Sequence, residues 1–337
     1  MTTSEGNNGF LLKNGGLLTT VQHLGTSGLR AYGVSGGGAM DRESLRIANW
    51  LTGNSEDEAG LELTLAGPEL VLETDMLVAI TGAPMSPSVD GEALPMWRPV
   101  WVRQGAAIRF GRAARGCRTY VAAAGGLAGG RGKAGRLRAG DFVRLRERGE
   151  AAPSRWAAEW AAVLAREAGG RNWSAARWFA PPPRSSSCYG GGAPQAVIGL
   201  RTMTGSEFGQ FSEAARTAFF RERYRVAPAS DRMGCRLEGA PLERLSRAEL
   251  LSHGVTPGAV QVPPGGLPIV LGADCQTTGG YPKIAHVATV DLPLLGQLKP
   301  GDWLSFQHVA LEEAQRLDLE SEYEMSMLKA AIRSRRP

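Results

Sequence analysis

Hydrophobic and polar side chains alternate in short stretches over much of the chain. In the first half this pattern occurs at residues 16–22, 61–65, 69–73, 76–81, 107–110 and 119–123. A period of two is typical of strands with one buried face. Glu62 is a polar member of one such strand, so we expect it to face solvent, with the mouth of a barrel as the alternative. The pattern predicts a closed or strongly curved sheet over residues 1–150.

Helical spacing of apolar residues is rarer. Asp41 is a good N-cap, and the apolar positions between it and Gly53 predict a helix that ends near that glycine. Further helices are expected in the alanine-rich stretch with two tryptophans, in a short polar stretch and near the end of the chain, at residues 151–168, 212–224 and 312–333. Helices are therefore predicted to be few.

A run of proline, serine and glycine at residues 181–192 has the composition of a linker. Because 337 residues exceed what one core usually fills, we predict two domains. The first is a β-barrel at residues 1–150, followed by a helix and the linker at 151–194. The second is a β-barrel at 195–315, followed by a C-terminal helix at 316–337. The predicted fold is mainly β with a few helices.

The densest group of polar side chains lies at residues 274–285, between two apolar runs that predict strands at 267–271 and 284–290. Binding groups are often carried on loops that a rigid sheet holds in place. The candidates in this stretch combine an amide, two hydroxyls, a phenol and an ammonium group: Gln276, Thr277, Thr278, Tyr281 and Lys283. The alternatives are a polar hairpin turn and a lysine that lies over a barrel rim.

Two further loops are rich in glycine and polar groups. In the loop at residues 25–41, Gly37 and Gly38 let the backbone approach an anionic or carbonyl group, and Asp41 starts the helix that follows. The loop at residues 230–239 contains Asp231 and Arg232. We expect these two residues to line the same cleft as residues 36–41, since ligand sites favour domain junctions. The alternatives are a plain surface loop and a surface ion pair of little energetic weight.

The composition excludes several classes of function. The net charge of +5 is small, and the arginines are not interleaved with aromatic residues as in nucleic-acid-binding proteins. Four cysteines and four histidines are scattered without metal-ligand spacing, which argues against a metal site. Residues 130–134 lack the glycine and hydroxyl positions of a Walker loop. No apolar run is long enough for a membrane span, so a cytoplasmic protein is expected.

Taken together, short motifs along residues 17–310 resemble one family. In the first half they are TTVQ at 19–22 with Gly25, GAMD at 38–41, Leu61-Glu62, TGA at 81–83, GCRTY at 116–120 and AGG at 124–126. In the second half they are SDRMG at 230–234, RLEG at 236–239, GAVQVP at 258–263 and the stretch at 274–285. The chain is identified on these motifs as a member of the biotin-dependent carboxyltransferase-like family.

That family includes the KipI antagonist, the C subunit of bacterial ATP-dependent 5-oxoprolinase and the carboxyltransferase domain of urea carboxylase. The resemblance implies two cyclophilin-like β-barrel domains. It also implies work in a multi-subunit complex with a KipI-like (PxpB-like) subunit and a lactam-utilisation (PxpA-like) subunit. This sequence departs from the family pattern at His23 and Thr26, where Asp and Arg are usual, and it is shorter after Gly126.

The function that the resemblance implies is that of an enzyme subunit, which with ATP opens the lactam of 5-oxo-L-proline to L-glutamate. The first alternative is carboxyl transfer from biotin carried on a partner protein, and the second is regulation by binding a KipI-like protein. Stabilising a developing oxyanion or phosphate requires cations and amides, and carboxyl transfer requires a base. The expected catalytic residues are Lys283, Asp231, Arg232 and Gln276. The expected substrate-binding residues are Gly37, Gly38, Asp41, Thr277, Thr278 and Tyr281.

Overall fold

The computed structural model describes residues 8–128, 135–146, 153–183, 197–246 and 250–337. Within these ranges the chain is mainly β, with five α-helices. It divides into two compact units. The first consists of Met1–Leu24, Arg42–Pro183 and Ser326–Pro337, and the second of Gly25–Asp41 and Arg184–Met325. The glycine-rich loop therefore belongs to the second unit, although it lies near the start of the sequence.

The first unit contains two six-stranded sheets. One has the order β11 (Phe142–Arg144), β1 (Gly9–Asn14), β4 (Glu69–Leu72), β9 (Ala107–Arg109), β6 (Ser88–Val89) and β7 (Glu92–Ala93). The other has the order β12 (Trp173–Ala175), β8 (Val100–Val102), β5 (Met76–Gly82), β10 (Arg118–Ala123), β3 (Gly60–Thr64) and β2 (Leu18–Gln22). Side chains from both sheets share one hydrophobic core, which includes Phe10, Leu72, Leu63 and Val121.

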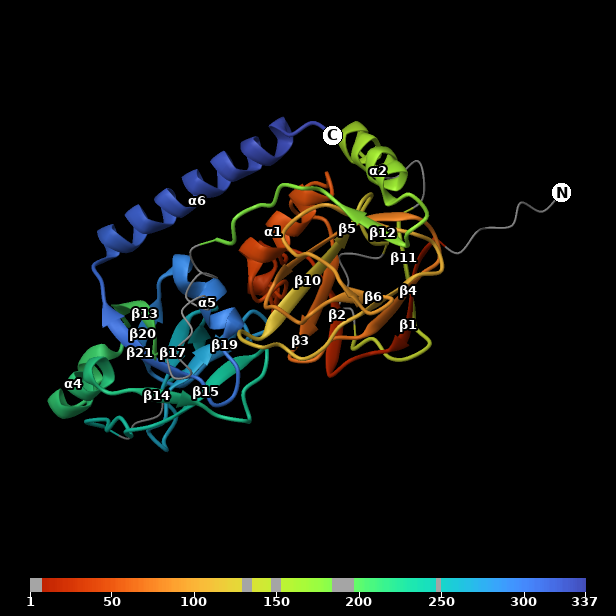
Figure 1. Cartoon of the computed structure of the whole chain (residues 1–337). Helices are drawn as coiled ribbons and strands as arrows, with labels where there is room; N and C mark the ends of the chain where they lie inside the picture. The colour runs from red at the N-terminus through yellow and green to blue at the C-terminus, as the bar shows by residue number, and fades with distance from the viewer. Residues whose placement is uncertain (1–7, 129–134, 147–152, 184–196, 247–249) are drawn as a thin grey trace. The chain divides into compact units, whose positions relative to one another are not determined.

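Two helices of the first unit pack on its second sheet. Helix α1 (Arg42–Leu51) contacts β5 and β10, as Figure 1 shows. Helix α2 (Arg155–Ala168) begins at Ser154, whose side chain accepts a hydrogen bond from the Ala157 N–H. Trp101 of β8 is buried in a cluster with Trp160 of α2. Core packing therefore explains this tryptophan.

Glu62 does not face solvent. Its side chain is only 1% exposed, and one carboxylate oxygen accepts a hydrogen bond from the Tyr120 hydroxyl at 2.7 Å. The other oxygen lies 3.5 Å from Nε of Arg118, which is also buried. Alternation along β3 identified the strand, but it did not reveal that α1 covers the polar face of this sheet. The solvent-facing expectation for Glu62 was therefore wrong.

We expect Glu62→Ala to lower the free energy of unfolding of the first unit by about 3–5 kcal/mol, because removing one partner of a buried ion pair leaves the other charge buried. Glu167→Ala is the matched control, since Glu167 is exposed on α2 and such changes usually stay within about 0.5 kcal/mol. Denaturant unfolding followed by tryptophan fluorescence measures both. Equal midpoints for the two variants would show that the buried cluster contributes little.

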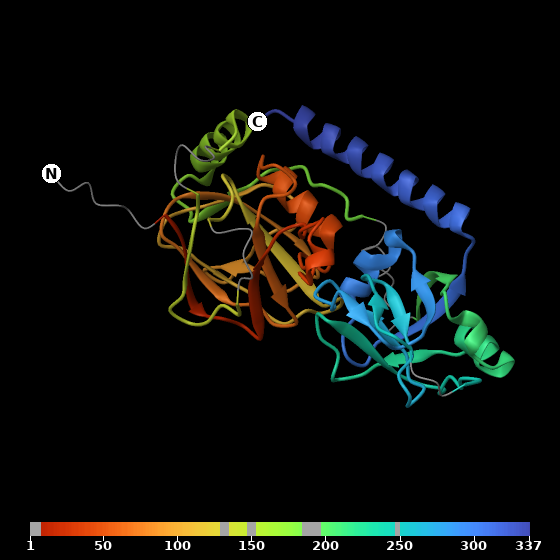
Figure 2. The same cartoon turned by 180° about the vertical axis from the view of Figure 1, so that it is seen from behind.

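The second unit is built around a closed barrel of seven strands. Their order is β13 (Val197–Thr204), β20 (Lys283–Val287), β17 (Ala259–Gln261), β18 (Ile269–Leu271), β15 (Gly234–Glu238), β14 (Tyr224–Val226) and β21 (Trp303–His308). Strands β13 and β21 pair in parallel, and the other described pairs are antiparallel. Figure 2 shows the barrel from behind. Aromatic and aliphatic side chains such as Phe219, Phe306 and Val260 fill its core.

Three helices and a small two-stranded sheet complete the second unit. Ser212 caps α4 (Glu213–Arg221), α5 (Leu292–Gln297) has a proline in its first turn, and α6 (Leu311–Ser334) ends the chain. The small sheet pairs β16 (His253–Gly254) with β19 (Thr278–Gly279). The last turns of α6, from Ser326 onwards, group with the first unit. No described helix is long and apolar enough to cross a lipid bilayer.

The prediction of a mainly β chain with a few helices is confirmed. A closed barrel is present in the second unit, whereas the described strands of the first unit form two separate six-stranded sheets. The predicted domain boundaries remain a prediction, and the two compact units have different bounds. Residues 130–134, which we compared with a phosphate loop, and residues 184–194 of the predicted linker lie outside the described residues.

Candidate functional site

Residues 272–282, which contain four of the predicted site residues, do not form a hairpin turn. Strand β17 lies between β18 and β20 and pairs with both. The connection from β18 to β20 therefore passes from one end of β17 to the other, and on the way it contributes β19 to the small sheet. The polar hairpin considered from the sequence is excluded, because β18 and β20 are not neighbours.

Lys283, the first residue of β20, lies against two polar side chains. Its ammonium group forms a hydrogen bond with Nε2 of His253 and lies 3.6 Å from Oε2 of Glu207. The pairing of β17 with β20 shifts register between Val260 and Gln261, next to Lys283. Such bulges are common beside active sites, where they redirect a side chain. The structure thus holds Lys283 in a defined polar cluster, and not loosely over the barrel rim.

The hydrogen bonds of His253 define which ring nitrogen carries the proton. Nδ1 lies 3.0 Å from the carbonyl oxygen of Leu251. A carbonyl oxygen only accepts hydrogen bonds, so Nδ1 carries the proton and donates it. In the neutral ring Nε2 is then the acceptor, which suits the ammonium group of Lys283. His253 therefore accepts a hydrogen bond from the ammonium group of Lys283 and orients it.

Glu207 reaches Lys283 from the turn that follows β13. The backbone N–H of Gly205 donates to the carbonyl of Ile284 at 2.8 Å, and a Cβ at Gly205 would lie only 2.2 Å from the Lys283 carbonyl oxygen. Glycine is therefore required for this close approach. Oε2 of Glu207 also accepts a hydrogen bond from the Lys283 backbone N–H at 2.8 Å. The Glu207 carboxylate thus contacts both the main-chain N–H and the side-chain ammonium group of Lys283.

Opposing effects act on the pKa of Glu207. Burial raises it, but hydrogen bonds from the Lys283 N–H and the Ser206 hydroxyl, with the charge of Lys283, together bring the pKa below its ordinary value of 4.5. The folded carboxyl therefore binds its proton more weakly than the unfolded one. Its stabilising contribution is complete above about pH 4.5 and is lost as the pH falls through the lower folded value.

We expect Glu207→Gln to flatten the acid side of the stability profile. Between about pH 5 and about pH 3, the wild type should lose more free energy of unfolding than the variant, as measured by urea denaturation of the second unit. Glu238→Gln is the control, because Glu238 is exposed on β15. Parallel profiles for wild type and Glu207→Gln would contradict the assignment of this carboxylate.

Arg232 forms a second cluster in the same unit. Its Nε and Nη2 donate to the two carboxylate oxygens of Asp274 at 2.8 and 2.9 Å, and Nη2 also donates to the Gly38 carbonyl at 2.6 Å. The Gly37 N–H donates to the Ala273 carbonyl at 3.1 Å. Arg232 therefore joins the glycine-rich loop to the polar stretch. The expectation that Arg232 lies beside residues 36–41 agrees with these contacts.

The carboxylate of Asp231 acts within its own loop, whereas that of Asp41 contacts α5. Oδ1 of Asp231 accepts the N–H groups of Met233 and Gly234 at 2.8 and 3.0 Å, so this carboxylate shapes the turn. Asp41 is fully buried, and its Oδ2 accepts from the Gln297 amide at 2.8 Å. Neither carboxylate is described in contact with Lys283.

The other predicted residues lie on the connection between the two clusters. The side chains of Gln276, Thr278 and Tyr281 are exposed, and Thr277 is half-buried. Thr278 pairs across the small sheet with Gly254, the residue after His253. The structure thus brings the polar stretch, the glycine loop and Arg232 together, and it places Lys283 at the far end of the same connection.

Sequence reasoning missed Glu207 and His253 and did not select Asp274 as a site residue. Glu207 and His253 come from segments 76 and 30 residues away from Lys283. No local pattern connects such positions. Asp274 is part of the polar stretch at 274–285. Its hydrogen bond with Arg232, which is 42 residues earlier, forms only in the folded barrel.

The family model of the carboxyltransferase domain, subdomains A and B, matches residues 32–308. The chain belongs to this carboxyltransferase-domain family. The matched range includes both polar clusters, with Lys283 and Arg232. The resemblance noted from the motifs is thereby confirmed.

Relatives of this carboxyltransferase-domain chain include the C subunit of 5-oxoprolinase from Escherichia coli, which is 35% identical over 89% of this chain and 91% of the relative. Urea amidolyase of Saccharomyces cerevisiae is 27% identical over 90% of this chain, but the match covers 17% of that enzyme. Among solved structures, urea amidolyase of K. lactis superposes with a TM-score of 0.80 at 24% identity, over 97% of this chain and 20% of that one. The last match shows the shared fold.

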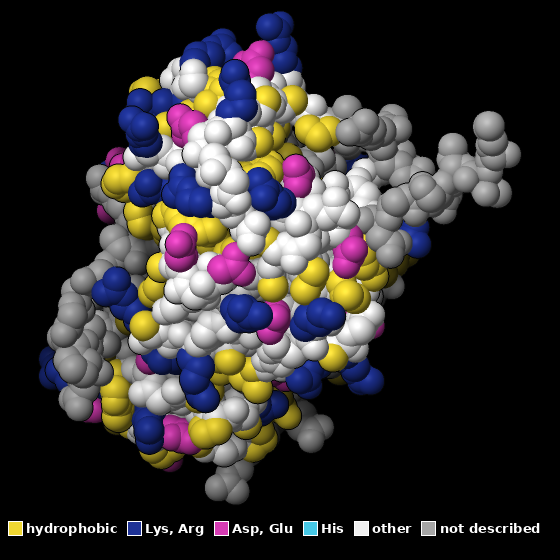
Figure 3. Space-filling view, turned by 45° about the vertical axis from the view of Figure 1, so that its right-hand side comes forward, with side chains coloured by type: hydrophobic (Ala, Val, Ile, Leu, Met, Phe, Trp, Pro, Cys, Tyr) yellow, Lys and Arg dark blue, Asp and Glu magenta, His cyan; other side chains and the backbone are white. Residues whose placement is uncertain are grey.

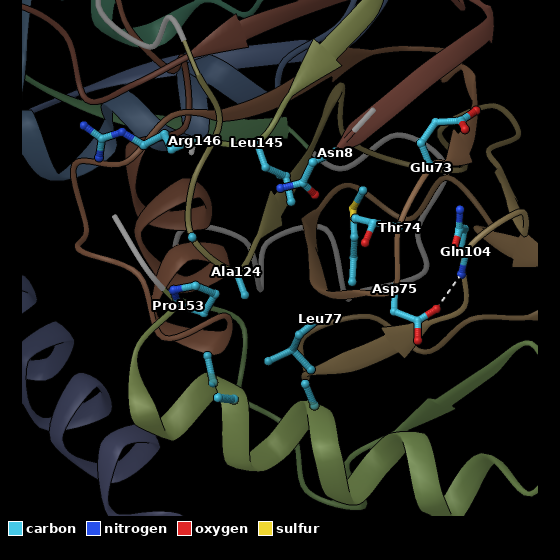
Figure 4. Close-up of a pocket in the computed structure, with 15 residues that line it drawn as sticks. Asn8, Glu73, Thr74, Asp75, Leu77, Gln104, Ala124, Leu145, Arg146 and Pro153 are labelled. Carbon is cyan, nitrogen blue, oxygen red and sulfur yellow. Dashed lines mark hydrogen bonds between the residues drawn. The ribbon is translucent and has the colours of Figure 1, made fainter. Parts of the chain in front are cut away.

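The carboxyltransferase-domain chain also has a cavity of about 490 Å³ in its first unit. Figure 4 shows Asp75 directed at Gln104, whose backbone N–H donates to it at 2.8 Å. Another lining residue, Arg146, donates to Glu58 at 2.6 Å. These charged groups are paired within the chain, and none of the predicted site residues lines this cavity. The clusters around Lys283 and Arg232 therefore remain the better candidates for chemistry.

Surface charge marks no further site on the face drawn in Figure 3. On the face drawn in Figure 3, basic side chains are interspersed with acidic and hydrophobic ones. Within the described part of the chain, no group of three His, Cys, Asp or Glu side chains is arranged to hold a metal ion.

Proposed function

We propose that this chain is the C subunit of an ATP-dependent 5-oxoprolinase, which hydrolyses 5-oxo-L-proline to L-glutamate. The observation that carries the proposal is the match to the Escherichia coli protein, at 35% identity over 89% of this chain and 91% of that protein. A match of nearly equal lengths argues for the same role. We further propose that both units are variants of the cyclophilin-like barrel and that the protein works in the cytoplasm.

Within the enzyme complex, the chain would act with a KipI-like subunit and a lactam-utilisation subunit. Arg232 and Lys283, the cations expected to meet phosphate, already lie against Asp274 and Glu207. These two residues therefore do not fit a triphosphate, and we assign ATP binding to the partner subunits.

For the site we propose that Lys283 acts directly on the substrate. A lactam carbonyl gains negative charge on oxygen when it is attacked, and a preorganised ammonium group stabilises that charge. Glu207 and His253 hold the ammonium in place. Arg232 and Asp274 position the glycine loop, so that Gly37 and Gly38 face the substrate, and Asp231 and Asp41 fix the ends of their loops.

The exposed side chains along the connection would form the rest of the binding surface. We assign the substrate amide and ring contacts to Gln276, Thr277, Thr278 and Tyr281, since these lie between the two clusters. Their hydroxyl and amide groups can donate and accept hydrogen bonds with a lactam.

Carboxyl transfer is the second candidate, because the yeast urea amidolyase is 27% identical over 90% of this chain. In that case biotin would arrive on a partner protein. The regulatory alternative, binding of a KipI-like protein without turnover, draws on the same family resemblance. The length of the match favours 5-oxoprolinase, since the chain corresponds to 17% of urea amidolyase and to 91% of the Escherichia coli 5-oxoprolinase protein.

Two assays on one preparation distinguish these functions. The chain is copurified with its KipI-like and lactam-utilisation partners and given either 5-oxoproline with ATP or urea with bicarbonate, ATP and a biotinylated carrier domain. We expect glutamate in the first assay and no carboxylated urea in the second. The reverse result would replace the proposed function with carboxyl transfer, and inactivity in both would favour the regulatory alternative.

A further inference from the structure

Arg30 lies beside the site without having been predicted as part of it. It starts the short 3-10 helix η1 (Arg30–Tyr32) in the glycine-rich loop, and the N–H of Gly33, which has a φ of 77°, closes that turn on the Arg30 carbonyl. Nη2 of Arg30 donates to the carbonyl oxygens of Val255 and, at 3.1 Å, of Gln276. The guanidinium therefore bridges the segment after β16 and the polar stretch before β19.

The partners of Arg30 are neutral, which distinguishes it from two other half-buried arginines of the second unit. Arg201 and Arg232 each donate through two nitrogens to the carboxylate of one aspartate. By contrast, among the residues that the structure describes, no carboxylate oxygen lies within 4 Å of the Arg30 guanidinium nitrogens. Asp274, the acid of the adjoining segment, is already held by Arg232 on both oxygens. The positive charge of Arg30 is therefore not neutralised by the described part of the chain.

The side of the guanidinium that carries Nη1 faces glycine. A Cβ placed on Gly36 would lie 3.8 Å from Nη1 of Arg30, so the glycine leaves this approach clear of a side chain from position 36. Nε and Nη1 donate to no described residue. A guanidinium nitrogen with unused N–H groups, such as Nη1, can donate charge-assisted hydrogen bonds to a carboxylate.

We propose that Arg30 binds the carboxylate of the substrate and so selects cyclic amides that carry an acid group. This inference rests on the proposed function. Val255 follows His253 by two residues, which is about 6–7 Å along an extended segment. Arg30 donates a hydrogen bond to the Val255 carbonyl, and Lys283 forms a hydrogen bond with the His253 ring. In the proposed arrangement, a small ring with an acid substituent presents its carboxylate to Arg30 and its carbonyl to the Lys283 cluster.

The test compares two ligands that differ only in charge. Binding of 5-oxoproline and of 5-oxoprolinamide to the assembled complex is measured by titration calorimetry for wild type, Arg30→Gln and Arg30→Lys. We expect Arg30→Gln to weaken the acid about 10- to 100-fold, the range of a charge-assisted hydrogen bond. Affinity for the amide should stay within about twofold, and Arg30→Lys should restore part of the loss because it keeps the charge.

Arg236→Gln is the matched control, because Arg236 is exposed on β15 of the same barrel. Melting temperatures of all variants are recorded, and the KM for ATP is measured alongside. If Arg30→Gln weakens both ligands equally, or neither, the carboxylate assignment is overturned while the proposed function stands. A raised KM for ATP with unchanged binding of the acid would also overturn it, because Arg30 would then bind phosphate. If the wild type binds no 5-oxoproline, the proposed function itself fails.

Discussion

We expect Lys283→Ala to lower glutamate release by the assembled complex about 10²- to 10³-fold, the usual cost of losing one preorganised group that stabilises an oxyanion. Folding should be retained, since the contacts that hold this segment are made by the backbone. The Lys283 N–H still donates to Glu207, and the Gly205 N–H still donates to Ile284. The variant therefore removes the ammonium group and leaves its surroundings in place.

The measurement is turnover with 5-oxoproline and ATP, together with the melting temperature of each complex. Lys299→Ala is a suitable control, because Lys299 lies in the same unit and is paired with Asp302 at 2.8 Å. An unchanged melting temperature with unchanged turnover for Lys283→Ala would exclude a catalytic role for this lysine. A large loss of activity with Lys299→Ala as well would point to a general effect of charge.

The second large effect concerns the isolated chain, which we expect to release no glutamate above background. The cations of the candidate site lie against Asp274, Glu207 and His253. In the proposed mechanism these groups position and polarise the substrate, and coupling to ATP is assigned to the partner subunits. Activity should appear only when the KipI-like and lactam-utilisation subunits are added.

This expectation is checked by purifying the chain alone, each pair of subunits and the full set, and assaying all of them under the same conditions. Robust release of glutamate by the lone chain would contradict it and would place the whole reaction on this polypeptide. Activity of a pair would show which partner is dispensable.

Local sequence patterns predicted the secondary structure well because each depends on neighbouring residues. Alternation gave β3 and β10, and the serine before each of α2 and α4 acts as the N-cap. The sheet arrangement was less accessible. Alternation alone does not distinguish a closed barrel from two sheets that share one core, and this explains the difference between the expected and observed first unit.

In the candidate site, too, some features could be predicted from local sequence and others could not. The polar stretch at 274–285 and the glycine loop were visible as unusual local composition. The sequence did not reveal three other residues of the site, Glu207, His253 and Arg30. Nothing in their own segments marks them, and each contacts residues that are far away in the sequence. Burial of Glu62 was missed for a related reason, since the residues that cover it cannot be read from β3 itself.

We propose that this chain is a required part of an enzyme that couples ATP hydrolysis to lactam opening. The most direct measurement is the amount of glutamate released per ATP hydrolysed by the two partner subunits, with and without this chain. We expect coupled release of glutamate only when the chain is present. Glutamate release of the same size and ATP ratio without the chain would contradict the claim.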